Sequence, residues 1–132
     1  MKIIVDTSVV IAVLLNEHHK TELVEMTKGA ELFAPGSLYY EIGNAFSAMI
    51  KQKRIPVETL LQAIEYFFEI PITLFDVDLK NSLKISEKHT LYAYDAFFID
   101  CAQRNKMPLL TLDKKLAQAA KEERIEIMEV KK

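Results

Sequence analysis

The sequence predicts an α/β fold: a single domain over residues 1–132, with a central, mostly parallel sheet of about five strands and helices on both faces. Two observations lead to this prediction. Short apolar runs without polar alternation recur along the chain, and such runs are typical of strands buried on both faces. Stretches of helical length separate them, which is the pattern of parallel strands joined by helical crossovers. A length of 132 residues suits one domain with its own core.

The first half of the chain contains clear signals for where its elements begin and end. Thr7 or Ser8 can cap the first helix, and Gly29 can stop the second. Ser37 can cap the third helix, which must stop before Pro56. We therefore expect a strand over 2–6, helices over 9–15 and 18–28, a strand over 31–34, a helix from the Ser37 turn to before Pro56, and a helix over 57–68.

The second half continues the alternation. Pro71 precedes an apolar run, and in the helix that follows we expect Leu79 and Leu83 to face inward. Thr90 is a candidate cap for the next helix, and Pro108 leads into another apolar run. The predicted elements are a strand over 72–75, a helix over 78–88, a helix from Thr90 to about Asn105, a strand over 109–112, a helix from Asp113, and a last strand over 125–130.

Composition and charge exclude several classes of protein. With 17 basic and 19 acidic residues the net charge is −2, so the chain cannot attract nucleic acid by bulk charge, and any such contact must be local or bridged by metal. Cys101 is the only cysteine, so no internal disulfide can form, as suits a reducing cytoplasm. The longest early apolar run, 9–15, is too short to span a membrane. We expect a cytoplasmic protein with no membrane contact.

Four acidic residues fall where the predicted elements converge. Asp6 ends the first strand, and Asp113 ends the run over 109–112. Glu41 lies early in the helix after the second strand, and Asp95 lies early in the helix before the fourth. The carboxyl ends of parallel strands meet at one edge of the sheet, where the sites of such folds lie. Taken singly, each acid can be a helix cap or a solvated side chain, but together they indicate a shared site.

Carboxylates gathered at one edge repel one another, and a divalent cation relieves that repulsion. A donor set made only of oxygen suits Mg²⁺ or Mn²⁺ better than Zn²⁺. Such ions promote hydrolysis of phosphodiesters, and they also supply positive charge that an acidic chain lacks. The sequence has no glycine-rich phosphate loop and no Ser-His-Asp or Cys-His arrangement, which disfavours nucleotide binding and covalent hydrolysis.

The segments around these acids resemble the motifs of the PIN-domain family. They are Lys2–Ser8 (KIIVDTS), Ser37–Asn44 (SLYYEIGN), Tyr94–Ala96 (YDA) and Leu110–Leu116 (LTLDKKL), which occur in the family's order and cover nearly the whole chain. The resemblance implies a PIN-like three-layer sandwich. The small size is similar to that of VapC-type toxins of prokaryotic toxin–antitoxin pairs.

The resemblance also implies an activity and partners. It implies a ribonuclease that depends on Mg²⁺ or Mn²⁺ and acts on RNA, forms a homodimer and is neutralised by a small antitoxin protein. It implies that the catalytic residues and metal ligands are Asp6, Glu41, Asp95 and Asp113, with supporting roles for Thr7, Asn44 and Thr111. Two alternatives stay open: a non-catalytic α/β interaction domain whose acids only cap helices, and a PIN-like nuclease that acts on DNA.

Several other polar residues have more than one interpretation. We expect Asp100 to serve in a partner contact or a polar rim, and Asp78 to cap the helix that follows it. Tyrosines near the acids, Tyr92 and Tyr94 among them, can stack on RNA bases or can lie at the edge of the core.

Overall fold

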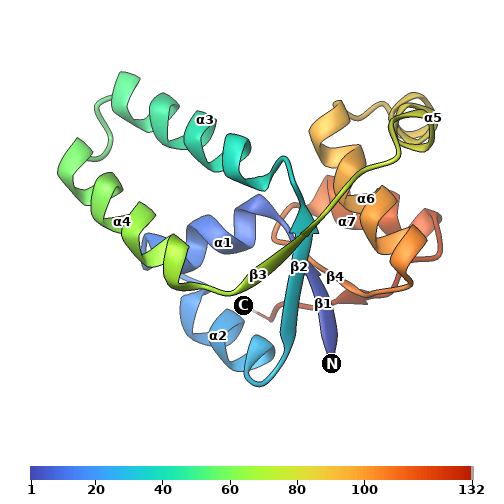
Figure 1. Cartoon of the computed structure of the whole chain (residues 1–132), viewed down its shortest axis with the longest axis horizontal. Helices are drawn as coiled ribbons and strands as arrows, with labels where there is room; N and C mark the ends of the chain where they lie inside the picture. Colours follow the sequence, from blue (N-terminus) through green and yellow to red (C-terminus); the bar gives the residue numbers. More distant parts are fainter. Residues whose placement is uncertain (132) are drawn as a thin grey trace.

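A five-stranded sheet in the order β3-β2-β1-β4-β5 forms the middle of the protein (Figure 1). The computed structural model describes residues 1–131. The strands are β1 (Lys2–Val5), β2 (Glu31–Pro35), β3 (Ile72–Phe75), β4 (Leu109–Leu110) and β5 (Ile127–Met128). Every neighbouring pair is parallel. The predicted α/β class with a parallel sheet of about five strands is therefore confirmed.

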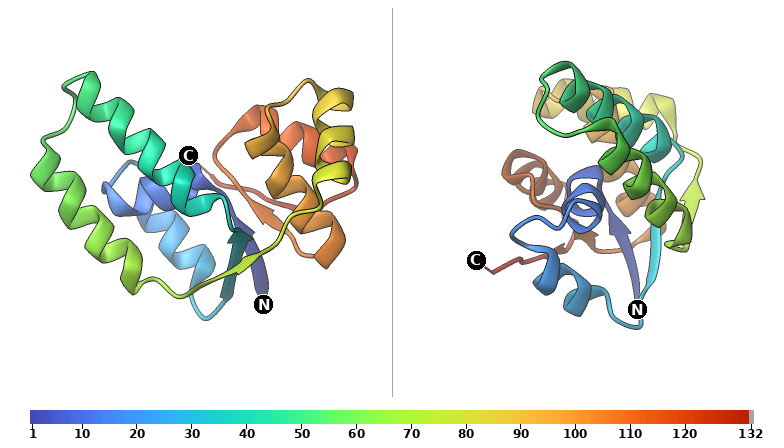
Figure 2. Two further views of the ribbon diagram at one scale, coloured as in Figure 1. Left: turned by 45° about the horizontal axis from the view of Figure 1, so that its top comes forward. Right: turned by 90° about the vertical axis from the view of Figure 1, so that its left-hand side faces the viewer.

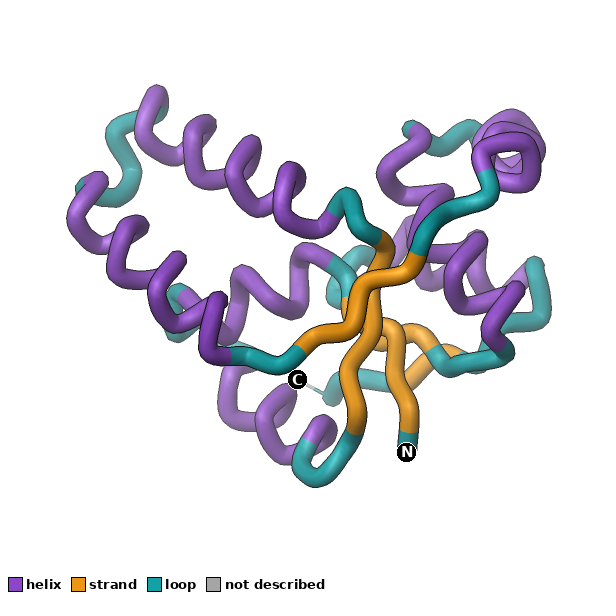
Figure 3. Tube along the Cα trace, viewed as in Figure 1, coloured by secondary structure: helices purple, strands orange, loops and turns teal. Residues whose placement is uncertain are grey.

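Helices cover the sheet from two sides. They are α1 (Thr7–Leu14), α2 (Lys20–Thr27), α3 (Leu38–Lys51), α4 (Val57–Glu69), α5 (Leu79–His89), α6 (Ala93–Asn105) and α7 (Lys114–Glu122). Figures 1 and 2 show α1–α4 on one side of the strands and α5–α7 on the other. In Figure 3 the strands lie between these two groups of helices. No helix within residues 1–131 is long and apolar enough to cross a membrane.

The central strand β1 is deeply buried beyond its first residue. Ile3, Ile4 and Val5 are almost completely buried, as the unalternated apolar run predicts. Full burial of each such side chain contributes roughly 1.5–3 kcal/mol of transfer free energy. Because β2 and β3 lie on one side of β1, and β4 and β5 on the other, the order of strands reverses here. Sites in such sheets lie beyond the carboxyl ends of the strands at this reversal.

The ends of several elements differ from the predictions. The strands predicted over 109–112 and 125–130 are only two residues long each. In the first of them, Thr111 lies beyond the strand end and donates a hydrogen bond to Asp6 at the carboxyl edge. Thr90 does not cap α6: it ends α5 in the left-handed conformation (φ 54°), and α6 begins three residues later. The N-cap of α1 is Asp6 rather than Thr7 or Ser8, since its carboxylate accepts from the Val9 N–H.

The predicted inward face of α5 is wrong. Leu79 and Leu83 are 61% and 62% exposed, and the helix instead buries Ser82 and Ile85. These two buried residues lie three apart, so they are neighbours on the helix surface and together form its buried face. The expected cap is confirmed, because the Asp78 carboxylate accepts from the Asn81 N–H.

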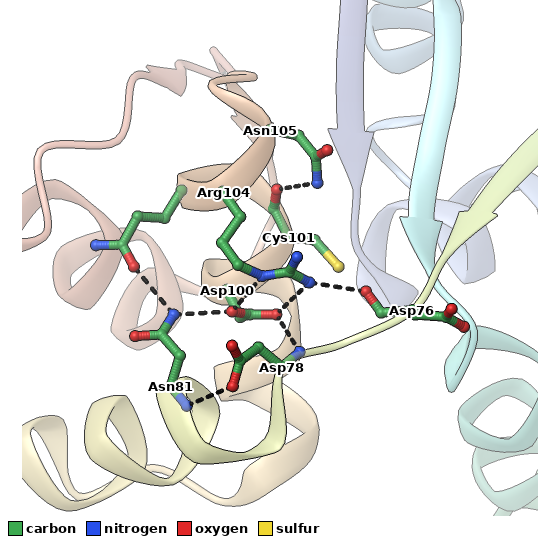
Figure 4. Close-up of polar contacts among 8 residues, drawn as sticks. Asp76, Asp78, Asn81, Asp100, Cys101, Arg104 and Asn105 are labelled. Carbon is green, nitrogen blue, oxygen red and sulfur yellow. Dashed lines mark hydrogen bonds and ion pairs between the residues drawn. The ribbon is translucent and has the colours of Figure 1, made fainter.

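The buried Asp100 carboxylate of α6 pairs with Arg104 of the same helix and hydrogen-bonds to the start of α5 (Figure 4). The Asp100 carboxylate is completely buried and accepts from Arg104 Nε (2.9 Å), Asn81 Nδ2 (2.8 Å) and the Asp78 N–H (2.9 Å). Burial alone would raise the pKa of Asp100, but the hydrogen bonds from these three residues outweigh it and lower the pKa. Asp100 is thus a structural residue of the interior, and its predicted place in a partner contact or polar rim is wrong.

Candidate active site

Asp6 follows β1 directly and is buried at the carboxyl edge of the sheet. Its Oδ1 accepts from the Ser8 hydroxyl (2.6 Å) and the Val9 N–H (3.2 Å), and its Oδ2 accepts from the Thr111 hydroxyl (2.5 Å). Burial raises the pKa of Asp6 to about 6, against the opposing effect of these three hydrogen bonds and with a further increase from nearby Asp113. Burial therefore destabilises the ionised form of Asp6, and a bound cation would stabilise it.

Glu41 lies in the first turn of α3, after β2 and its turn. The Thr7 hydroxyl donates to its Oε1 (3.0 Å) and the Ser37 hydroxyl to its Oε2 (2.8 Å). Burial raises the pKa of Glu41 to about 7, with further increases from Asp95 and Asp6. Like Asp6, Glu41 is held by two hydroxyl groups.

Asp113 and Asp95 complete the set from α7 and α6. Asp113 caps α7, where its Oδ1 accepts from the N–H groups of Lys115 (2.9 Å) and Leu116 (3.1 Å). Asp95 lies in the first turn of α6, and its carboxylate makes no hydrogen bond within residues 1–131. Burial and the charge of Asp113 raise the pKa of Asp95, and Lys115 lowers it.

The electrostatic effects among these four acids form a closed ring. Asp113 raises the pKa values of Asp6 and Asp95. Asp6 and Asp95 in turn raise that of Glu41. Four elements that are far apart in the sequence thus bring all four predicted acids close enough to repel one another. We call Asp6, Glu41, Asp95 and Asp113 the acidic ring.

The acidic ring suits a hard cation that keeps part of its water. Its donors are all carboxylate oxygens, which Mg²⁺ and Mn²⁺ prefer. Within residues 1–131 no three acidic, histidine or cysteine side chains lie close enough together to enclose a metal ion by themselves. Mg²⁺ does not need such a cage, because it keeps several waters and binds through one or two carboxylates together with substrate oxygens.

The residues with predicted supporting roles are placed differently from one another. Thr7 bonds Glu41, and Thr111 bonds Asp6 and also accepts from the Asp113 N–H (2.9 Å). Asn44 is exposed, and no hydrogen bond joins its side chain to Glu41 within the described part of the chain. A role for Asn44 stays a prediction.

Sequence reasoning missed two hydroxyls at the site. Ser8 and Ser37 were expected to cap helices, yet each donates to an acid of the ring. Ser8 also accepts from the Leu112 N–H (3.1 Å), so it links the start of α1 to the segment after β4. The signal that could have found them is their place beside the acids, two residues after Asp6 and four before Glu41.

Comparison with known proteins identifies the family. The model of the PIN domain matches residues 3–122, which is most of the chain. The chain belongs to the PIN-domain family. Nucleases of this family are hydrolases and typically use a divalent metal.

Individual relatives point to a distant homology with VapC ribonuclease toxins. The chain is 25% identical over 125 residues to Ribonuclease VapC3 of Pyrobaculum aerophilum, covering 89% of this chain and 94% of that protein. Its fold is similar to that of VapBC2 from Rickettsia felis bound to a DNA fragment from their promoter (TM-score 0.66, 13% identity, 97% and 98% covered). It is also similar to Mycobacterium tuberculosis VapC20, a toxin that cleaves the sarcin-ricin loop (TM-score 0.61, 12% identity, 89% and 94% covered).

Proposed function

We propose that this chain is a metal-dependent endoribonuclease that hydrolyses RNA phosphodiester bonds, and that it is the toxin of a VapBC-type pair. The observation that carries the proposal is the acidic ring: four carboxylates from four elements meet at the carboxyl edge of the sheet, where burial and neighbouring acids raise the pKa values of Asp6, Glu41 and Asp95. A protein that needed these acids only as helix caps would gain nothing from burying Asp6 and Glu41, because neither gains a cationic partner there.

In this proposal the acidic ring holds Mg²⁺ or Mn²⁺. When bound, the cation would supply positive charge to the phosphate and favour ionisation of an attacking water. The chain's own residues keep the carboxylates in place: Ser8 and Thr111 fix both oxygens of Asp6, and Thr7 and Ser37 fix both oxygens of Glu41. Asp95, which accepts no such hydrogen bond from the described residues, is free to adjust to the cation or to a water.

The test is cleavage of RNA in the presence of Mn²⁺ by the unaltered chain and by Asp6→Asn and Asp95→Asn. Both variants should lose cleavage while keeping the circular dichroism spectrum of the folded protein. Glu58→Gln, an exposed acid in the first turn of α4, is the matched control and should cleave normally. Full activity of both ring variants would overturn the assignment of the site.

The substrate is tested by the same assay with RNA, single-stranded DNA and branched DNA at equal concentration. We expect cleavage of RNA, as the name of the Pyrobaculum relative indicates for that protein. Cleavage of the DNA substrates alone would replace the ribonuclease by a DNA-directed PIN nuclease. A calorimetric titration that shows no binding of Mn²⁺ would favour a non-catalytic interaction domain.

We further propose a homodimer and a small antitoxin partner. The support is the likeness to VapC proteins, together with large exposed apolar side chains such as Leu61 and Phe68 on α4. Light scattering should give twice the mass of one chain. Co-expression with the product of the neighbouring small reading frame should yield a stable complex in which RNA cleavage is inhibited.

A further inference from the structure

We propose that the pocket between α5, α6 and α7 binds a nucleotide of single-stranded RNA next to the phosphate that is cleaved, with its base on Tyr92 and its phosphate at Lys115. We call it the Tyr92 pocket. The inference rests on the proposed ribonuclease function and adds a positioning subsite to it.

The Tyr92 pocket opens beside the acidic ring. It is an open pocket of about 510 Å³ with Asp95 in its wall, and the remaining wall is formed by Ser86 and Glu87 at the end of α5, the segment 90–92 and Lys115 of α7. This volume lies within the roughly 300–1,000 Å³ that is typical of sites for small ligands. In Figure 1, α5, α6 and α7 lie together on one side of the sheet, so the pocket is built from one group of helices. A ligand bound there would be adjacent to any reaction at the acidic ring.

Lys115 supplies the positive charge that a phosphate needs. Its Nζ donates to the Thr90 carbonyl (3.2 Å), which draws the side chain from α7 across to the end of α5. The ammonium group has three donors, and this hydrogen bond occupies one of them. Lys115 is also close enough to Asp95 to lower the pKa of that acid. A cation is thus held between the pocket and the acids, on a chain with no excess of positive charge.

Tyr92 supplies an aromatic surface. It is 85% exposed and immediately precedes α6. Tyr94, two residues later, packs against Phe97, whereas Tyr92 has no aromatic neighbour within residues 1–131. An unpacked ring at the mouth of a pocket is a platform on which any base can stack, and proteins bind single-stranded nucleic acid by this contact without reading its sequence.

The first experiment uses fluorescence, because the chain contains no tryptophan. Tyr92→Trp introduces one fluorophore at the pocket, in an Asp6→Asn background that prevents cleavage. A short single-stranded RNA, added with Mg²⁺, should quench this fluorescence through stacking. Tyr66→Trp in the same background is the control, since Tyr66 is also exposed (53%) but lies on α4. Its fluorescence should not change.

The second experiment separates binding from chemistry in the otherwise unaltered chain. Tyr92→Ala should raise KM for RNA about tenfold with little change in kcat, as the loss of one stacked base implies. Tyr92→Phe, which keeps the ring, should restore KM. Lys115→Met should raise KM and weaken its dependence on salt, because one phosphate contact is lost, and Lys115→Arg should restore both.

The outcomes distinguish this inference from the proposed function. Cleavage of RNA by the unaltered chain, with no quenching in Tyr92→Trp and a normal KM in Tyr92→Ala, would overturn the subsite and leave the ribonuclease standing. Quenching without any cleavage by the unaltered chain would overturn the nuclease, and with it the placement next to a cleaved phosphate, but would leave the Tyr92 pocket as a site that binds RNA. The absence of both cleavage and quenching would overturn the two together.

Discussion

The Thr111 hydroxyl donates to Asp6 Oδ2 at 2.5 Å and thereby joins residues that are 105 positions apart in the chain. The same hydroxyl accepts from the Asp113 N–H at 2.9 Å. One buried side chain therefore connects two acids of the ring across the paired strands β1 and β4. The separation of Asp6 from Asp113 depends on Thr111 as well as on the register of the sheet.

Thr111→Val tests this connection, because valine keeps the shape and removes the hydroxyl. Loss of a hydrogen bond to a charged group should lower the free energy of unfolding at pH 8 by roughly 1.5–3 kcal/mol. It should also raise the pKa of Asp6 above about 6 and move the acidic limb of the activity profile to higher pH. Urea unfolding and a pH–rate profile measure the two effects. Thr111→Ser should resemble the unaltered chain, and an unmoved acidic limb in Thr111→Val would contradict the role of the hydroxyl.

The stability of the metal-free protein should rise as the pH falls from 8 to 5. Folding raises the pKa of Asp6 from 3.8 to about 6 and that of Glu41 from 4.5 to about 7, so the folded state binds more protons than the unfolded state in this window. For Asp6 the effect is on the order of 2 kcal/mol. Asp100 and Glu123 have lowered pKa values, so the stability that they contribute is lost only at lower pH.

Thermal unfolding in EDTA between pH 5 and 8 measures this dependence. Asp6→Asn should flatten the curve and raise the unfolding temperature at pH 8, because the buried charge is gone. If the unfolding temperature instead fell steadily from pH 8 to pH 5, the prediction that burial destabilises the ionised acids of the ring would be contradicted.

Divalent metal should flatten this slope. A cation binds the ionised carboxylates, so it stabilises the folded state most above the pKa values of Asp6 and Glu41. At a concentration one hundred times the Kd, the gain is about 2.7 kcal/mol. The measurement is the unfolding midpoint at pH 8 with Mn²⁺ and after its removal by EDTA. An equal shift in the Asp6→Asn, Asp95→Asn double variant would place the cation elsewhere.

Two acids of the site, Asp6 and Asp113, could be predicted from strand ends, whereas Glu41 was located by its place early in a helix and Asp95 chiefly by the family resemblance. A buried apolar run identifies β1, and the residue after it, Asp6, must lie at the carboxyl edge. The hydroxyls could not be assigned in the same way. Ser37 and Thr7 are typical helix caps, and whether they bond a backbone N–H or Glu41 depends on contacts between different elements, since Thr7 and Glu41 are 34 positions apart.

For a related reason, the sequence of α5 did not predict which face of this helix is buried. Leu79 and Leu83 form the obvious apolar pair, but the close packing of α5 on α6 favours a small residue at the contact, and Ser82 fills that place. The buried Asp100 also draws the N-terminal turn of α5 toward α6 through the Asp78 N–H and Asn81. Polar tertiary contacts therefore override the hydrophobic pattern of the helix.

Arg104→Met should be among the most destabilising single changes on the surface of α6. It removes the charge-assisted hydrogen bonds that the half-exposed Arg104 donates to the buried Asp100, and the loss of such bonds costs about 1.5–3 kcal/mol. Arg104→Lys should recover part of this, since lysine keeps the charge but loses the paired donors. Lys121→Met is the control: its partner Glu129 is exposed, so the loss should be below about 1 kcal/mol. Urea unfolding of the three variants measures these changes in the free energy of unfolding. Equal losses for Arg104→Met and Lys121→Met would contradict the prediction.

Ser82→Ala should stabilise the protein. The Ser82 side chain is fully buried between α5 and α6, and its Oγ has no hydrogen-bond partner within the described residues. Such an unsatisfied group costs about 1–3 kcal/mol, and alanine removes it while improving helix propensity.

The control for Ser82→Ala is Ser47→Ala on the exposed face of α3, where the hydroxyl donates to the Asn44 carbonyl (2.8 Å). This change increases helix propensity but does not remove a buried hydroxyl that lacks a hydrogen-bond partner. We expect the free energy of unfolding to rise by about 1 kcal/mol in Ser82→Ala and by less in Ser47→Ala, as measured by urea unfolding at pH 7. A loss of stability in Ser82→Ala would mean that the hydroxyl has a partner, such as a buried water, that makes it part of the α5–α6 contact.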